Sequence, residues 1–423
     1  MTVKSLPVKL VLIAIESAAF ALLTLWIGRA YFADVVSRRL DVEDLGLAAR
    51  LDPGESDYHL KLGRLYQYSL SDIDPGKAIA QLTRAAQLDP MDPQAWLDLG
   101  AAQVVAGQID QAAISLRQAD YLAPNLPGFQ WAIANFFLLH GNVGEAMRHF
   151  KVVLAGTQRY DGVIFNTAWK AVGDGDQILA TLIPDRPVTE FAYLYFLVGQ
   201  GKAAEAKKVW DRIAASPAPF GALAAAHYLD WLMAAHLPDE AYGVWTDLRK
   251  RKLVTESAAP GNLVMNGDFE QGIENFGFGW RIDNYPGVYL TQDSTIFHSS
   301  GHSVLIAFTG KGNLTYQGFH QWVKVTTGVA YQARVYMKTD GITTDSGPRL
   351  QVFDTVNPAA LNVVSDQLTG TNAGWTLLTV DFKPKETRYV TVCITRLPSA
   401  KLDNNIAGKV WVDDVSVAPI ASE

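Results

Sequence analysis

Hydrophobic and polar positions follow three different patterns along the chain, and each pattern predicts a different kind of structure. Residues 10–28 form an almost unbroken apolar run, and a helix of about 20 such residues can cross a membrane. Residues 34–252 place alanine and leucine at helical spacing, whereas residues 262–423 alternate valine, threonine and aromatic residues between glycine-rich turns. The predicted fold class is therefore multidomain, with a transmembrane helix, an all-α segment and an all-β sandwich.

Changes in this pattern set the expected domain boundaries. Residues 1–33 form an N-terminal tail and anchor, residues 34–252 a helical domain, residues 253–261 a linker, and residues 262–423 a sandwich. The linker contains adjacent alanines followed by proline and glycine, a composition that continues neither a helix nor a strand.

The apolar run from Leu10 to Gly28 is interpreted as an uncleaved membrane anchor, interrupted only by Glu16, Ser17 and Thr24. A cleavable signal peptide is the alternative, but that class has a shorter apolar core and a small-residue cleavage site, which the residues after Trp26 do not provide. Lysines before the run and arginines after it nearly cancel the positive-inside bias. Because large domains cross membranes largely regardless of charge, we expect the bulk of the chain in the periplasm or outside the cell.

A repeat runs through the helical segment, with Pro90 and Pro124 standing 34 residues apart. Its clearest unit has an aromatic residue, a leucine–glycine pair, spaced alanines and a closing proline: Trp96, Leu99, Gly100, Ala112, Leu116, Ala119 and Pro124. The unit before it matches at Leu62, Gly63, Tyr66, Ala78, Leu82, Ala85 and Pro90. Small residues allow the two helices of a hairpin to approach, and proline stops the second helix. The pattern resembles the tetratricopeptide-repeat family, which implies a solenoid of stacked helix pairs.

The repeat becomes weaker toward the C-terminus. The unit after Pro124 keeps Ala146 and Phe150 but has no closing proline. Two further units are indicated by Trp210 and Trp245, each of which follows an aromatic-rich first helix. The pattern does not fix the number of repeats after residue 155.

The family resemblance implies a concave surface lined by the first helix of each hairpin. Transferring the family's positions names these groove residues: Arg64, Tyr68, Leu97, Ala101, Val104, Trp131, Asn135 and Leu138. The set carries little charge, which favours a protein partner that places a helix or an extended segment in an apolar groove. The alternative is a groove that is filled by the packing of its own side chains and binds no partner.

The C-terminal part shows alternating strands in residues 331–338, 349–353 and 375–382. Its opening segment, NLVMNGDFEQG in residues 262–272, and its closing segment, VWVDDVSV in residues 410–417, resemble the galactose-binding-like jelly rolls of carbohydrate-binding modules in families 4, 9 and 22. The resemblance covers nearly all of the segment and implies a jelly roll that contacts a glycan. The paired end motifs are more specific for the fold than for sugar binding.

The same resemblance implies a structural calcium ion, because the family often carries one where the first and last strands meet. Carboxylates suit such a hard cation. The resemblance implies Glu270 and Asp413 as the calcium ligands. Asp414 is the alternative to Asp413, because adjacent residues of a strand face opposite sides of the sheet.

A glycan site needs aromatic rings and polar side chains on one sheet face. The alternation of polar and apolar side chains places Arg334, Tyr336 and Lys338 on the more solvent-exposed face of one strand. The full set of glycan candidates is Arg334, Tyr336, Lys338, Gln351, Phe353, Tyr285 and Tyr289. Each aromatic ring has the alternative role of packing in the sandwich, where large rings are usually buried.

Composition narrows the function classes. The chain has 43 acidic and 36 basic side chains and a formal net charge of -7, so it lacks the broad basic surface of nucleic-acid-binding proteins. Its one cysteine, Cys393, cannot form an intrachain disulfide or a zinc cluster. A glycosidase would need a carboxylate pair across a cleft, whereas Glu270 with Glu274, or Asp413 with Asp414, lie at the ends that close the fold. We therefore expect no enzyme.

Together these inferences predict a non-catalytic, membrane-anchored scaffold of the cell envelope. The helical repeats bind a protein partner, and the jelly roll binds a glycan or a second protein, as in surface polysaccharide assembly. Two alternatives stay open. One is a calcium-stabilised structural subunit of a membrane complex without sugar binding, and the other is an accessory subunit of a glycan-processing enzyme.

Overall fold

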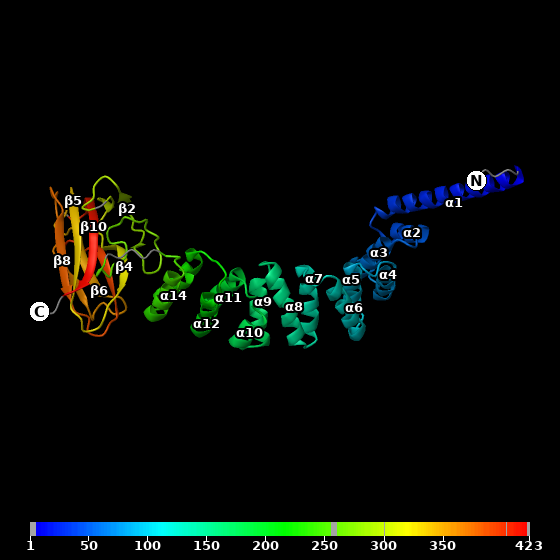
Figure 1. Cartoon of the computed structure of the whole chain (residues 1–423), viewed down its shortest axis with the longest axis horizontal. Coiled ribbons are helices and arrows are strands. Elements are labelled where there is room, and N and C mark those ends of the chain that lie inside the picture. Colours follow the sequence, from blue (N-terminus) through cyan, green and yellow to red (C-terminus); the bar gives the residue numbers. More distant parts are fainter. Residues whose placement is uncertain (1–5, 255–259, 300, 403, 421–423) are drawn as a thin grey trace. The chain divides into compact units, whose positions relative to one another are not determined.

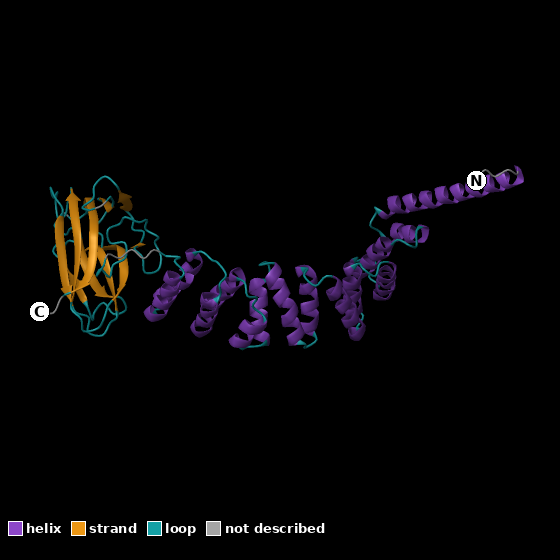
Figure 2. Cartoon of the chain, in the orientation of Figure 1, coloured by secondary structure: helices purple, strands orange, loops and turns teal. Residues whose placement is uncertain are grey.

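The computed structural model describes residues 6–254, 260–299, 301–402 and 404–420. Helices occupy the N-terminal part of the described chain and strands the C-terminal part (Figures 1 and 2), which confirms the predicted fold class. The chain divides into two compact units, Met1–Tyr193 and Leu194–Glu423. The second unit thus contains the last helices as well as the strands. Most of the predicted linker, residues 255–259, lies outside the described residues.

The described chain contains fourteen α-helices and one short 3-10 helix. They are α1 (Leu6–Ser37), α2 (Val42–Leu51), α3 (Ser56–Tyr68), α4 (Pro75–Leu88), α5 (Pro93–Val105), α6 (Ile109–Leu122), α7 (Pro127–Leu139), α8 (Val143–Gly156), α9 (Asp161–Ala171), α10 (Gly175–Thr181), α11 (Pro187–Gly199), α12 (Ala203–Ala215), η1 (Ala222–Ala225), α13 (Ala226–Ala234) and α14 (Pro238–Lys250). An Asp–Pro pair starts both α4 and α5: the carboxylates of Asp74 and Asp92 accept backbone N–H groups of the first turn, and proline takes a position that needs no donor.

Helix α1 is 32 residues long, and its segment Val8–Ser37 is long and apolar enough to be a membrane anchor or a signal sequence. Its C-terminal end packs against the next two helices. Ala33 is fully buried and belongs to one cluster with Ala48 of α2 and Tyr58 of α3. The Arg29 guanidinium donates a hydrogen bond of 3.0 Å to the carbonyl of Leu51. The helix therefore continues without interruption from the apolar run into the first helical layer.

Close glycine contacts hold the helical hairpins together, as the repeat pattern predicts. A Cβ atom on Gly63 of α3 would lie 2.6 Å from Cγ of Leu82 in α4, and one on Gly100 of α5 would lie 2.7 Å from Cγ of Leu116 in α6. The alanines of the second helices are fully buried: Ala78, Ala85, Ala112 and Ala119. At this separation, only glycine leaves room for the leucine.

The strands form two antiparallel five-stranded sheets. They are β1 (Arg281–Ile282), β2 (Val288–Asp293), β3 (Ser303–Thr309), β4 (Tyr316–Lys324), β5 (Tyr331–Asp340), β6 (Arg349–Asp354), β7 (Asn362–Val364), β8 (Thr376–Phe382), β9 (Tyr389–Arg396) and β10 (Ala407–Pro419). One sheet has the order β1-β4-β9-β6-β7 and the other β2-β3-β10-β5-β8. Buried residues of both sheets, among them Phe319, Val335 and Val392, form one core between them.

The opening segment of the sandwich runs beside its last strand. The N–H of Leu263 donates to the carbonyl of Val417 over 2.9 Å, and the N–H of Val415 donates to the carbonyl of Gly267 over 2.8 Å. The two end motifs therefore lie together, as the sequence predicts. This pairing brings residues 262–272 close to the carboxylates of β10.

Within the second unit, α14 packs against the loop that precedes β1. Trp245 is buried, and its ring lies 5.5 Å from that of Phe276 and 6.0 Å from that of Phe278, between centroids. Gly277 between them has a φ of 56°, and a Cβ atom there would lie 2.6 Å from Cζ3 of Trp245. The tryptophan thus sits directly on the backbone of the loop.

Polar contacts surround this packing. The Arg281 guanidinium donates to Oδ1 of Asp230 in α13 over 2.6 Å. Oδ1 of Asp239 in α14 accepts the hydroxyl of Tyr389 in β9 over 2.9 Å, and its other oxygen accepts the Arg388 guanidinium. The last helical hairpin is therefore joined to the sandwich by both apolar packing and hydrogen bonds.

We predict that Gly100→Ala lowers the free energy of unfolding by up to about 2 kcal/mol. Overpacking a close contact usually costs about 1–3 kcal/mol, and the gain of about 1 kcal/mol in helix propensity offsets part of that cost. Gly46→Ala in α2 is the matched control, because a Cβ atom there meets no heavy atom within 4 Å, and it should not destabilise the protein. Urea unfolding followed by circular dichroism measures both variants. Equal effects would contradict the close packing of α5 on α6.

Candidate functional site

An apolar groove of ≈ 310 Å³ lies across α3, α5 and α7, all in the first unit. Its lining residues are Tyr68, Leu97, Asp98, Ala101, Val104, Leu116, Ala132, Asn135, Phe136, Leu139 and His140. Five of the eight predicted groove residues are among them: Tyr68, Leu97, Ala101, Val104 and Asn135. Two large side chains of the lining are strongly exposed, Tyr68 at 64% and Leu139 at 81%. The groove is open because small alanines on α5 and α7 leave room between the larger groups.

Arg64, another predicted groove residue, points instead into an ion pair with Asp98. The Arg64 guanidinium donates to Oδ2 of Asp98 over 2.5 Å, and the Gln94 amide donates to the other oxygen over 2.8 Å. Burial raises the pKa of Asp98, while Arg64 beside it acts in the opposite direction. The pair joins α3 to α5 at the floor of the groove, so Arg64 has a positioning role there.

Trp131 and Leu138 also lie outside the groove lining. The ring of Trp131 stacks on Tyr160, with centroids 4.4 Å apart and an angle of 13° between planes. Its carbonyl accepts a hydrogen bond of 2.7 Å from the Asn135 amide. The groove lining on α7 therefore starts at Ala132, and Trp131 packs against the start of α9.

The predicted alternation of β5 is present. Ala333, Val335 and Met337 are fully buried, whereas Arg334 and Tyr336 line a pocket of ≈ 290 Å³ on the outer face, together with Asn262, Gly267, Asp268, Asp414, Val415 and Ser416. Lys338 is half-buried on the same face of β5. The Tyr336 ring stacks on His298, with centroids 3.7 Å apart, so one face of this ring is already covered.

Of the other glycan candidates, Tyr289 shares this face of the sheet, and the other three lie elsewhere. Gln351 and Phe353 belong to β6 in the opposite sheet, and Gln351 is buried. Its amide contacts Gln317 and Asn362 at 2.8 Å each. The Tyr285 ring packs 5.1 Å from that of Tyr316. Tyr289 on β2 is 68% exposed, but β3 and β10 separate its strand from β5.

Glu270, Asp413 and Asp414 all bind the segment that connects β2 to β3. Oε1 of Glu270 accepts the backbone N–H groups of residues 301 and 302 at 2.7 and 2.8 Å. Oδ2 of Asp413 accepts the N–H of His298 at 2.7 Å, and Asp414 contacts the imidazole of His298 at 2.6 Å. The three carboxylates therefore hold one loop from two sides.

The environments of these carboxylates differ. Asp413 is fully buried, and burial raises its pKa to about 6. Hydrogen bonds lower the pKa of Glu270, the N–H of Gly301 contributing most. Among the described residues, no three His, Cys, Asp or Glu side chains converge closely enough to hold a metal ion. As placed, these carboxylates accept N–H groups and do not form a cation cage.

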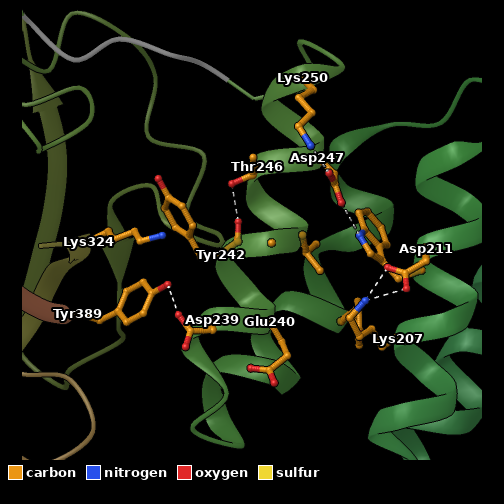
Figure 3. A pocket seen from close by; sticks show the side chains of 14 residues that line it. Lys207, Asp211, Asp239, Glu240, Tyr242, Thr246, Asp247, Lys250, Lys324 and Tyr389 are labelled. Carbon is orange, nitrogen blue, oxygen red and sulfur yellow. Dashed lines mark hydrogen bonds and ion pairs between the residues drawn. The ribbon is translucent and has the colours of Figure 1, made fainter. Parts of the chain in front are cut away.

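A larger pocket of ≈ 570 Å³ lies within the second unit, beside the contact between α14 and the sandwich (Figure 3). Residues of α12 and α14 line it together with Lys324 of β4 and Tyr389 of β9. Sequence reasoning missed this site because Asp239 and Tyr389, which bond across it, are 150 positions apart. The only local signal is the aromatic residue Trp210 in a degenerate repeat.

A scan against protein-family models finds no match, and a search of curated proteins also finds none. Structural comparison finds partial similarity to the enzymatically active domain of bacteriophage CBA120 tailspike protein 4. The sequence identity is 16%, the similarity covers 38% of this chain and 22% of that chain, and the TM-score is 0.28. The similarity therefore spans less than a quarter of the length of that chain.

Two further solved structures are similar to parts of the chain. A family 4 carbohydrate-binding module (CBM4) has 20% identity over 37% of this chain and 99% of that chain, with a TM-score of 0.28. The MamA protein has 16% identity over 44% of this chain and 89% of that chain, with a TM-score of 0.28. Each similarity covers less than half of this chain, and none assigns it a function.

We predict that Asp413→Asn lowers the free energy of unfolding by about 1–3 kcal/mol, because an amide NH₂ then faces buried N–H donors and leaves one unsatisfied. Asp414→Asn is the matched control. Asp414 is partly exposed and has a φ of 49°, a conformation that asparagine tolerates, so its loss should be smaller. Thermal melts of both variants measure the difference. A larger loss for Asp414→Asn would contradict the role assigned to Asp413.

Proposed function

We propose that the chain is a non-catalytic scaffold of the cell envelope. Its helical repeats bind a polypeptide segment in the groove across α3, α5 and α7, and its sandwich contacts a glycan through the outer face of β5. The apolar helix α1 anchors the chain in a membrane, with the bulk of the chain in the periplasm or outside the cell. Surface polysaccharide assembly is the process that these parts fit best.

The observation that carries this proposal is the apolar groove of the first unit. Tyr68 and Leu139 remain 64% and 81% exposed at its edge, and large exposed apolar side chains in a groove are typical of protein-binding sites. Ala101 at its floor leaves space for an incoming side chain. The resemblance of the repeats to the tetratricopeptide family supports a polypeptide as the occupant.

The support for a glycan is the pocket beside β5. Arg334 supplies a guanidinium donor, and Asp268 supplies a carboxylate acceptor across the same ≈ 290 Å³ pocket. Tyr336 offers a ring edge and a hydroxyl, which suit a sugar that has both polar and apolar sides. The end motifs of the sandwich, with their resemblance to carbohydrate-binding modules, support the same interpretation.

One observation favours the alternative of a structural subunit without sugar binding. The ring of His298 stacks on Tyr336 and covers the face on which a sugar would stack. In this alternative, the cluster of His298, Asp414 and Tyr336 stabilises the loop between β2 and β3. The sandwich then serves as a docking module for a second protein.

The non-catalytic assignment rests on the roles of Glu270 and Asp413. Both carboxylates accept backbone N–H groups of one loop, which is a structural use of these oxygens. A catalytic pair would instead flank a cleft. Structural calcium at Glu270, Asp413 and Asp414 is part of the proposal, because carboxylate oxygens are the ligands that calcium prefers.

To test the groove, a photo-cross-linking benzophenone amino acid replaces Tyr68, and in a control it replaces Tyr121 on α6, which is 77% exposed. Irradiated native membranes should give a discrete protein adduct from position 68 and none from position 121. Ala101→Arg should reduce that adduct by about tenfold or more, because an unpaired charge in an apolar groove costs over about 1.4 kcal/mol. Equal adducts from both positions would contradict the proposal.

To test calcium, the full chain is melted after chelation and after calcium loading. Binding to the folded state alone should stabilise the protein by about 2.7 kcal/mol at a hundredfold excess over Kd. The Glu270→Gln variant should lose this response. Identical melts for the chelated and calcium-loaded wild type would refute the calcium site.

A further inference from the structure

The pocket beside α14 has the size and walls of a ligand site. Its volume of ≈ 570 Å³ falls within the range of about 300–1,000 Å³ typical of small-molecule sites. Residues of α14 line the middle of the pocket, with Lys207 and Asp211 of α12 on one side and Lys324 and Tyr389 of the sandwich on the other (Figure 3). Because the hydroxyl of Tyr389 donates to Asp239 over 2.9 Å, the helical and sandwich walls are joined.

The charges of the pocket nearly cancel. Four carboxylates and three lysine ammonium groups line it, a difference of one negative charge: Asp211, Asp239, Glu240 and Asp247 against Lys207, Lys250 and Lys324. Lys207 pairs with Asp211 at 2.7 Å, and Lys250 pairs with Asp247 at 3.0 Å. A ligand with a strong net charge of either sign gains little in such a site, so the walls favour a neutral ligand.

The same groups retain hydrogen-bonding capacity toward the pocket. An ammonium group has three donors and a carboxylate about four acceptor positions, so each salt bridge leaves both kinds unused. Glu240 is exposed and lines the pocket. The walls therefore present both donors and acceptors, which suits a ligand whose groups both donate and accept, as hydroxyl groups do.

An apolar surface accompanies these polar groups. Tyr242 is half-buried, and the Lys324 ammonium lies 4.1 Å from its ring centroid. Tyr228 and Trp210 form part of the same lining. Aromatic walls with a few placed polar groups are typical of sites for ligands that are apolar on one side and polar on the other. Sugar rings have this character.

We propose that this pocket is a binding site for a neutral oligosaccharide, separate from the outer face of β5. Its carboxylates accept sugar hydroxyls, its lysines donate to hydroxyl oxygens, and Tyr242 adds an apolar contact. The site exists only where α12 and α14 meet the sandwich, so a separated sandwich would lack most of it. It does not depend on the glycan contact proposed for β5.

Gly243 provides a direct test. It lies on α14 in the pocket wall, and a Cβ atom there would meet no heavy atom within 4 Å. Gly243→Trp should therefore fill the pocket without disturbing the helix. Gly243→Ala is the matched control, since it improves helix propensity by about 1 kcal/mol and leaves the pocket open. Arg334→Ala, on β5, tests the other proposed glycan surface in parallel.

The full chain is purified in a detergent without a sugar headgroup and titrated by calorimetry with cellohexaose, xylohexaose and maltohexaose. An acidic oligogalacturonate and a Gly-Ser hexapeptide serve as the charged and peptide probes. At least one neutral hexasaccharide should bind. Gly243→Trp should weaken that binding by about tenfold or more, a change of about 1.4 kcal/mol, while Gly243→Ala leaves it unchanged. In the Arg334→Ala background, in which the β5 contact is weakened, Gly243→Trp should cause the same loss.

Three results would overturn the inference. The first is binding that Arg334→Ala removes and Gly243→Trp leaves intact, which would place the glycan at β5 and leave that proposed contact standing. The second is binding of only the acidic or the peptide probe. The third is no binding of any neutral hexasaccharide to the wild type, with melts showing that the protein is folded.

Discussion

The contact between Trp245 and the backbone of Gly277 is the constraint on which the second unit depends. A positive φ of 56° and a tryptophan carbon 2.6 Å from the would-be Cβ together exclude a side chain at this position. The indole can then fill the space over the loop, and Phe276 and Phe278 enclose it from both sides. Polar contacts lie around this apolar cluster: the salt bridge of Arg281 with Asp230 and the hydrogen bonds to Asp239. The walls of the larger pocket have their positions because this contact holds α14 beside the sandwich.

The helical part could be predicted from the sequence because its determinants are local and recur. Gly63 with Leu82 and Gly100 with Leu116 are pairs within single hairpins, so a 34-residue pattern contains both members. The larger pocket could not be predicted in this way. Its residues belong to two weak repeat units and to two strands, and nothing in the repeat pattern signals that Asp239 meets Tyr389. This contact is made by α14, the second helix of the last hairpin, where the helical repeat pattern is weakest.

The sandwich shows the limit of alternation as a guide. Alternation correctly separates the faces of β5, because successive side chains point to opposite sides of a strand. It does not say which sheet a strand joins, and the order β1-β4-β9-β6-β7 places Gln351 and Phe353 away from Tyr336. The carboxylates show a similar limit. The sequence predicts that Glu270 approaches Asp413, but oxygen atoms that suit a cation also suit backbone N–H groups, and only the position of the loop between β2 and β3 distinguishes the two uses.

Helix α1 passes from its apolar run to the buried Ala33 without a break, and Arg29 ties it to the end of α2. A continuous α-helix is stiff, so the chain has no joint between the proposed membrane segment and the first helical layer. Helices in bilayers change their tilt when the hydrocarbon thickness changes. In the proposed setting, a thicker or thinner bilayer would therefore turn the first helices with α1, so the orientation of the scaffold would depend on the lipid composition around its anchor.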